Sequence, residues 1–109
     1  MGVQFEEAAE ILRVLANPKR AQIVDVISTE EMHAKELLDY FQISQPTLSH
    51  DMKQLQNAGI VNARRAGRYI FYSLNQDRLR AFHSRLGELF FASKHGVARP
   101  RRNGTSSSN

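Results

Sequence analysis

The side chains that could do chemistry in this sequence lie mainly between residues 45 and 68. The stretch 45–54 supplies amides, hydroxyls, an imidazole and one ammonium group. Groups of these kinds can contact DNA base edges, which present distinguishable donors and acceptors in the major groove. Arg64, Arg65 and Arg68 follow within five residues of one another. Clustered guanidinium groups suit the phosphates of a nucleic-acid backbone, so the chemistry indicated is recognition of an anionic polymer.

Catalytic chemistry is not indicated. Ser49 and His50 are adjacent on a predicted helix and point in different directions, so they cannot act as a nucleophile and its base. The chain has no cysteine, which excludes a thiol nucleophile, a disulfide and a thiolate metal site. We find no phosphate-binding glycine loop and no carboxylate pair attached to a pocket. We therefore expect a binding protein that is not an enzyme and needs no cofactor.

Helical spacing of apolar residues covers most of the chain. It predicts five helices, at about residues 5–16, 19–27, 33–41, 45–57 and 77–94. Asn17 and Pro18 separate the first two helices, because proline disfavours helix in the residue before it. Ser44 is a good N-cap for the fourth helix, and Pro46 fits its first turn. The apolar stripe of the first helix is expected to be Phe5, Ala8, Ala9, Leu12, Leu15 and Ala16.

The pattern changes to alternation at residues 60–65 and 68–74, which predicts two strands joined at Ala66-Gly67. The expected fold class is mainly α with a small β-hairpin (α+β), comprising about five helices and one two-stranded hairpin. The expected core is Ile23, Val24, Ile27, Leu37, Leu38, Phe41, Leu48, Met52, Leu55 and Ile70.

Length and composition indicate one domain. A chain of 109 residues with 41% hydrophobic and 24% charged residues is typical of a soluble globular protein. Residues 1–94 should form the domain, whereas residues 95–109 are small, polar and basic and are expected to be a disordered tail. The sequence has no apolar run long enough to span a membrane and no secretory start. We expect a cytoplasmic protein with no membrane partner.

The helix at 45–57 presents its polar side chains on one face. At 3.6 residues per turn, Leu48, Met52 and Leu55 form the buried stripe, and Asp51 lies nearer that stripe than the exposed centre. The residues expected to meet DNA from this helix are Gln45, Pro46, Thr47, Ser49, His50, Lys53 and Gln54.

Two helices joined by a short turn and followed by an arginine-bearing hairpin form the winged helix-turn-helix pattern. The motifs LANPKR at 15–20, ISQPTLSH at 43–50 and RRAGRYIFY at 64–72 resemble the ArsR/SmtB family of bacterial transcriptional repressors. The resemblance spans roughly residues 5–92. It implies a recognition helix at about 45–57 and a wing at about 60–74, whose arginines contact the DNA backbone or minor groove.

The resemblance also implies a homodimer formed by the first and last helices, which agrees with their amphipathic character. The expected interface residues are Phe5, Leu12, Leu79, Phe82, Leu86 and Phe90. Two recognition helices would then meet successive major grooves about 34 Å apart on a near-palindromic operator.

Many members of that family sense metals, but the ligand positions do not match here. The family's cysteine pair corresponds to His33 and Lys35, and lysine is a poor ligand. The family's site on the last helix falls, in two possible registers, on Asp77, Leu79, Phe90 and Ser93 or on Gln76, Arg78, Leu89 and Ala92. Neither register can hold zinc. His83 and His95 are too far apart to chelate together within one chain, although a partner subunit could approach one of them.

The charge is divided unevenly along the chain. Residues 1–51 contain four Lys and Arg against nine Asp and Glu, whereas residues 52–109 contain eleven against two. A basic half favours an anionic partner. Two alternatives stay open: the weakly charged recognition helix with Asp51 could serve a protein partner, and the aromatic residues of the last helix could line a pocket for an apolar effector. The effector is otherwise unidentified.

Overall fold

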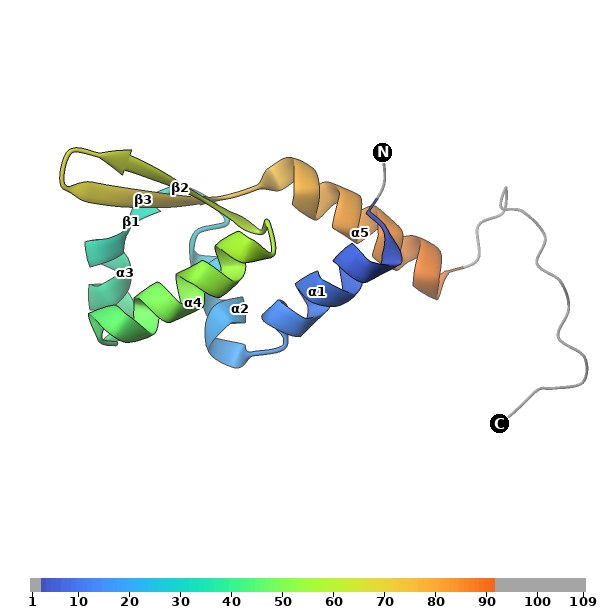
Figure 1. Ribbon diagram of the computed structural model, residues 1–109, viewed down its shortest axis with the longest axis horizontal. Helices are drawn as coiled ribbons and strands as arrows, with labels where there is room; N and C mark the ends of the chain where they lie inside the picture. Colours follow the sequence, from blue (N-terminus) through green and yellow to red (C-terminus); the bar gives the residue numbers. More distant parts are fainter. Residues whose placement is uncertain (1–2, 92–109) are drawn as a thin grey trace, which may run out of the picture.

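Five helices and a small sheet make up the computed structural model, which describes residues 3–91 (Figure 1). In chain order the elements are α1 (Phe5–Leu15), α2 (Pro18–Val26), β1 (Met32–His33), α3 (Ala34–Phe41), α4 (Gln45–Asn57), β2 (Val61–Ala66), β3 (Tyr69–Leu74) and α5 (Gln76–Phe90). The predicted fold class is confirmed. Figure 1 shows the β2–β3 hairpin and α3 at one end, with α1 and α5 towards the other.

Local signals in the sequence determine where α2 and α4 begin and where α4 ends. Asn17 caps α2 by accepting a hydrogen bond from the Arg20 N–H, and Ser44 caps α4 by accepting one from the Thr47 N–H. Gly59 follows the end of α4 with φ of +75°, a conformation that residues with a Cβ rarely adopt. The chain therefore turns sharply out of α4 and into β2.

The sheet has one more strand than the sequence predicts. Its order is β1-β3-β2, with both neighbouring pairs antiparallel. The predicted hairpin is present, but β1 adds to the edge of β3 that β2 leaves free. There Met32 pairs with Tyr72, and His33 pairs with Phe71. A strand of two residues has no alternation to detect, and it forms only because β3 is there to pair with it.

The core joins all the helices to the sheet. Of the predicted core residues, six are buried: Ile23, Ile27, Leu37, Leu48, Met52 and Leu55. The other four pack against the core while remaining partly exposed: Val24, Leu38, Phe41 and Ile70. The sequence did not single out the buried Ile60, Val61 and Tyr72, which close the core from the side of the sheet.

The predicted apolar residues of α1 do not include those that the helix buries most deeply, apart from Ala8. The helix buries Ala8, Ile11 and Val14, whereas Phe5 and Leu12 remain 61% and 45% exposed. Apolar residues occupy two adjacent sides of α1, and spacing alone does not decide which side meets the core.

The predicted last helix extends to about Lys94, but α5 ends at Phe90, because the Phe91 backbone is extended. Residues 92–94 of that prediction, and the tail predicted at 95–109, lie outside the described residues. None of the helices within 3–91 has the length and apolar character needed to cross a bilayer.

Gly59 provides a test of how α4 is terminated. A Cβ at this position would lie 2.5 Å from Arg78 Nε and 2.7 Å from Arg78 Cδ, in addition to the strain of the positive φ. We expect Gly59→Ala to destabilise the fold by roughly 2–3 kcal/mol. Gly67 has a φ of +64°, but a Cβ added there would meet no atom within 4 Å, so Gly67→Ala should cost only about 1 kcal/mol. Equal losses in urea unfolding would contradict a packing role for Arg78.

Candidate nucleic-acid interface

The recognition helix α4 is oriented as the sequence predicts. Leu48, Met52 and Leu55 are fully buried. On the opposite face, five of the predicted DNA-contacting residues are exposed: Gln45, Pro46, Ser49, His50 and Lys53. Thr47 and Gln54 are half-buried at the flanks. The helix therefore presents a polar surface along its length.

The exposed face of α4 is already partly ordered by its own hydrogen bonds. Gln45 Nε2 donates to Ser49 Oγ at 3.1 Å, and Ser44 Oγ donates to Thr47 Oγ1 at 3.0 Å. Lys53 is the one cationic side chain that the described part of this helix carries. A surface of amides, hydroxyls and an imidazole is suited to base edges rather than to phosphates.

Asp51 is the charged residue of α4 that faces inward. It is 4% exposed and lies 3.3 Å from the Arg20 guanidinium (Oδ1 to Nη1) and 3.7 Å from Lys19 Nζ. Arg20 also donates through Nε to the Val14 carbonyl at 2.7 Å. The carboxylate therefore attaches α4 to α2 and to the end of α1 and does not face DNA.

Sequence reasoning placed Asp51 near the buried side but missed its partner, Arg20. The signal was weak, because an acidic residue next to the Leu48–Met52–Leu55 stripe implies a cation without showing where in the chain that cation lies.

In the wing, Arg64 is held by an acidic partner. Its Nη2 lies 2.6 Å from Glu31 Oε1 and its Nε lies 3.2 Å from Glu31 Oε2. The guanidinium also lies 4.7 Å from the centre of the Phe71 ring. The hydrogen bonds from Arg64 lower the pKa of the Glu31 carboxyl below its usual value, so the pair stays ionised at neutral pH. Arg64 therefore fastens β2 to the segment before β1.

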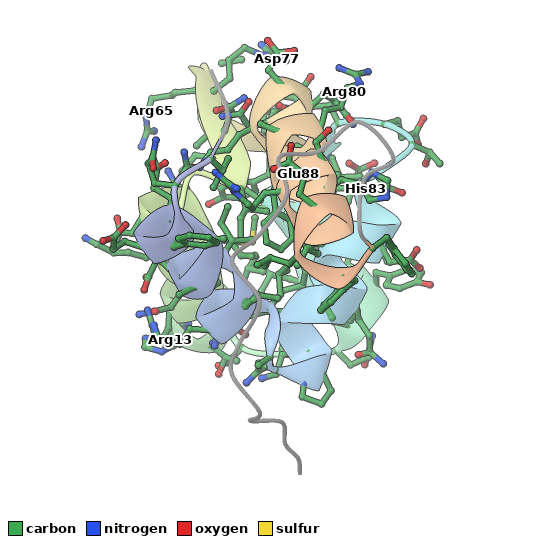
Figure 2. All side chains as sticks on the ribbon, turned by 90° about the vertical axis from the view of Figure 1, so that its right-hand side faces the viewer. Arg13, Arg65, Asp77, Arg80, His83 and Glu88 are labelled. Carbon is green, nitrogen blue, oxygen red and sulfur yellow. The ribbon has the colours of Figure 1, made fainter. Side chains whose placement is uncertain are left out.

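Arg65 and Arg68 are the less constrained wing cations. Arg65 pairs in register with Ile70 and Arg64 with Phe71, so the two arginines lie on opposite faces of the sheet. Arg68 is in the turn. Both side chains are exposed, and within residues 3–91 neither forms an ion pair. Figure 2 shows Arg65 pointing away from α5.

The remaining arginines between residues 69 and 91 are paired with acids. Arg78 lies 3.4 Å from Glu7, Arg80 3.6 Å from Asp77, and Arg85 3.1 Å from Glu88. Among the described residues, the basic side chains after position 51 without an acidic partner are Lys53, Arg65 and Arg68. The unneutralised charge therefore lies on α4 and the wing.

The predicted dimer residues lie along α1 and α5, which pack side by side (Figure 2). Phe5, Leu12 and Phe90 are exposed, and Leu79 and Leu86 are half-buried. Phe82 is 7% exposed within the single chain and leaves little surface for a partner. Arg85 lies 4.9 Å from the centre of the Phe5 ring, which joins the two helices at the surface.

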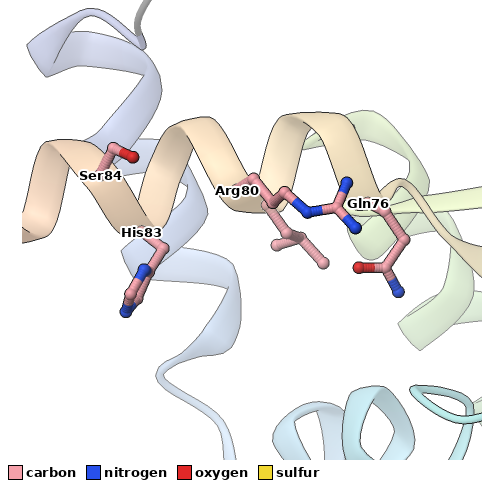
Figure 3. A pocket seen from close by; sticks show the side chains of 5 residues that line it. Gln76, Arg80, His83 and Ser84 are labelled. Carbon is pink, nitrogen blue, oxygen red and sulfur yellow. The ribbon is translucent and has the colours of Figure 1, made fainter.

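One side of α5 carries a shallow hollow of about 390 Å³, lined by Gln76, Leu79, Arg80, His83 and Ser84 (Figure 3). His83 is the one good metal ligand in this set. Across residues 3–91 no group of three or more His, Asp or Glu side chains is placed to hold a metal ion. His95, Ser93 and Ala92 of the positions considered above lie outside the described residues.

Comparison with known proteins identifies relatives of the same architecture. The model of a family described as "Bacterial regulatory protein, arsR family" matches residues 17–63. An arsenical resistance operon repressor of Staphylococcus xylosus is 43% identical over 77 residues, 71% of this chain and 74% of the relative. The transcriptional repressor SdpR of Bacillus subtilis is 32% identical, over 60% of this chain and 72% of its own. The crystal structure of NolR from Sinorhizobium fredii superposes with a TM-score of 0.63 at 34% identity, covering 81% of this chain and 88% of NolR.

The Arg20–Asp51 pair predicts a large effect on stability. Asp51→Ala leaves the largely buried Arg20 guanidinium, 13% exposed, without its counter-ion, so we expect a loss of about 3 kcal/mol in the free energy of urea unfolding. The exposed pair Arg13–Glu10, at 2.7 Å, serves as a control, and Arg13→Ala should cost less than about 1 kcal/mol. A similar small cost for Asp51→Ala would show that the buried pair does not hold α4.

Proposed function

This chain belongs to the ArsR family of bacterial regulatory proteins, and we propose that it is a homodimeric transcriptional repressor that binds a near-palindromic operator. Its relatives are transcriptional regulators and not enzymes, and the chain is a DNA-binding regulator. We propose a single DNA-binding and dimerisation domain at residues 1–94, since every described helix and the sheet contribute to one core.

The proposed reading element is α4. Its exposed residues Gln45, Ser49, His50 and Lys53 form a strip of donors and acceptors along one side of a 13-residue helix. A glutamine amide can pair with adenine in a bidentate manner, and a lysine can donate to guanine. Pro46, Thr47 and Gln54 complete the contact surface at the edges of the strip. The orientation of α4, with its apolar stripe buried, is the observation that best supports this role.

The proposed backbone contacts come from the wing. Arg65 and Arg68 are exposed and unpaired within the described residues, so they can bind phosphate or enter the minor groove without first losing a partner. Arg64 has to be shared with Glu31. We propose that Arg64 fixes the position of the wing and contributes less electrostatic attraction to DNA than its two neighbours do.

The proposed dimer interface is the outer surface of α1 and α5. Phe5, Leu12 and Phe90 are large apolar side chains exposed on adjacent helices, and Leu79 and Leu86 extend this surface along α5. Exposed apolar surface of this kind is a common sign of association. A second copy bound here would leave both α4 helices free to meet successive major grooves.

Regulation by the family's metal sites does not fit these residues. His33 accepts a hydrogen bond from the Glu36 N–H through Nδ1 and caps α3, and a lysine such as Lys35 is not among the usual zinc ligands. We propose repression by occupancy of the operator, with any effector acting through other groups. The alternative of a protein partner rested on Asp51. Because Asp51 is buried against Arg20, its carboxylate is not part of the exposed surface of α4, and this weakens that alternative.

Footprinting on the promoter of the protein's own gene tests the proposed function. We expect one protected, near-palindromic site, and we expect Arg65→Ala with Arg68→Ala to weaken binding to operator and random DNA alike. Each phosphate contact contributes about −0.9 to the slope of log K against log salt. The double variant should therefore reduce the magnitude of this slope by about 2. The matched pair Arg64→Gln with Glu31→Gln leaves the net charge unchanged and should leave the slope nearly unchanged. Full promoter affinity in the first variant would contradict the proposed wing contacts.

The dimer is tested by charge substitution on the α1–α5 surface. We expect Leu12→Asp with Phe90→Asp to shift the protein from dimer to monomer in sedimentation equilibrium, because two charges per subunit would have to be buried. Tyr40 on α3 is comparably exposed at 64% and lies off this surface, so Tyr40→Asp is the matched control. Dimers of unchanged stability in the double variant would place the interface elsewhere.

A further inference from the structure

A second cationic site lies beside α4, at the junction of three elements. A groove of about 410 Å³ separates the first turn of α3 from the start of β3 and reaches the first residue of α4. Leu38 and Ile70 supply apolar, half-buried walls. The exposed side chains around it are Lys35, Gln45, Arg68 and Tyr69. Each of these four carries at least one hydrogen-bond donor.

The groove has two positive charges and no acidic side chain in its lining. Lys35 comes from α3 and Arg68 from the wing turn, so the cations belong to different elements. Lys35 Nζ lies 4.0 Å from Asp39 Oδ2, and both side chains are 73% exposed, so this ion pair is weak and screened by water. Arg68 has no acidic partner within residues 3–91. Both cations are therefore available to an anion placed between them.

The helix N-termini beside this groove also carry partial positive charge. Lys35 is the second residue of α3 and Gln45 is the first residue of α4. The first turns of both helices of the helix-turn-helix therefore border one groove. Side-chain caps satisfy one N–H of each first turn, at Glu36 and at Thr47, and the Glu36 carboxylate accepts from the His33 N–H. The remaining N–H groups of the two first turns have no intrahelical acceptor. The charges of Lys35 and Arg68 and these two helix ends all favour a negatively charged occupant.

We propose that this groove holds one phosphate of the DNA backbone, with Lys35 on one side and Arg68 on the other. The inference rests on the proposed function and adds Lys35, on α3, to the DNA-contacting residues. Gln45 lies at both the groove and the start of the reading face, so this phosphate neighbours the bases that the first turn of α4 meets. Holding it fixes how far α4 enters the major groove.

The test is a salt series with Lys35 variants, using fluorescence anisotropy on a promoter fragment and on a random duplex of equal length. We expect Lys35→Met to weaken binding several-fold on both duplexes and to reduce the magnitude of the salt slope by about 0.9. Lys35→Arg should restore most of the loss. Asp39→Asn, which removes the competing carboxylate, should strengthen binding. Arg80 pairs with Asp77 on α5, so Arg80→Met is the control and should leave the slope unchanged.

A neutral methylphosphonate introduced at one backbone position at a time identifies the phosphate. At the position bound by Lys35, the substitution should weaken wild-type binding but have no further effect on Lys35→Met. Additive losses at every position, or an unchanged slope in Lys35→Met, would overturn the proposal. If the wild type binds the promoter and Lys35→Met binds it with the same affinity and salt slope, this inference alone is overturned. Failure of the wild type to bind DNA would overturn the proposed function as well.

A free phosphate is the competing source of the same chemistry. Inorganic phosphate titrated into the DNA-free protein at constant ionic strength should leave the backbone amide NMR signals of Lys35 and Tyr69 almost unchanged below about 10 mM. The two exposed cations are screened by water and contribute little to the binding of an isolated phosphate. Saturable shifts in that range, absent from Lys35→Met, would assign the groove to a small phosphorylated ligand and overturn the DNA proposal.

Discussion

The position of the recognition helix depends on one buried carboxylate and the arginine that neutralises it. Asp51 lies on the inner side of α4, and Arg20 reaches it from α2 while donating to the Val14 carbonyl at the end of α1. A buried charge is tolerated only where a counter-charge and hydrogen bonds compensate for lost hydration. Arg20 supplies a counter-charge and a hydrogen bond to Oδ1, and Lys19 adds a second positive charge 3.7 Å from Oδ2. These contacts join α4 to α2 and to the end of α1, with the polar face of α4 turned outward.

A second arginine does the same at the other end of α4. Arg78 donates through Nε to the Ala58 carbonyl at 3.0 Å and pairs with Glu7 on α1. Its guanidinium packs so closely on Gly59 that a side chain there would collide with it. Arg85 repeats the pattern by donating to the Val3 carbonyl at 2.8 Å. Much of the positive charge in the second half of the chain is therefore structural. Within residues 52–91, the cations without an acidic partner are confined to α4 and the wing.

Sequence reasoning recovered the features that are written locally. Proline in a first turn, the N-cap Ser44 and the 3.6-residue spacing of Leu48, Met52 and Leu55 predict the helix-turn-helix, and alternation predicts the hairpin. It could not recover contacts between distant residues: Asp51 and Arg20 are 31 positions apart, and Arg64 and Glu31 are 33 apart. β1 was missed for the same reason. Ile11 and Val14 were missed as the core side of α1, because the choice between two apolar sides is made by packing against α2 and α5.

The hydrogen bonds of Arg20 and Arg78 also connect the proposed dimer interface with the proposed DNA-reading surface of α4. α1 carries Phe5 and Leu12 on its outer side, and its own Glu7 and Val14 accept the hydrogen bonds from Arg78 and Arg20 that hold α4. The path from the apolar surface to the recognition helix is therefore one helix plus two charge-assisted hydrogen bonds, which are stronger than neutral ones. In a dimer formed on the α1–α5 surface, the separation of the two α4 helices is set by that short path. A stiff connection of this kind favours one operator spacing over others, because a fixed distance between the two α4 helices matches only one separation of the half-sites.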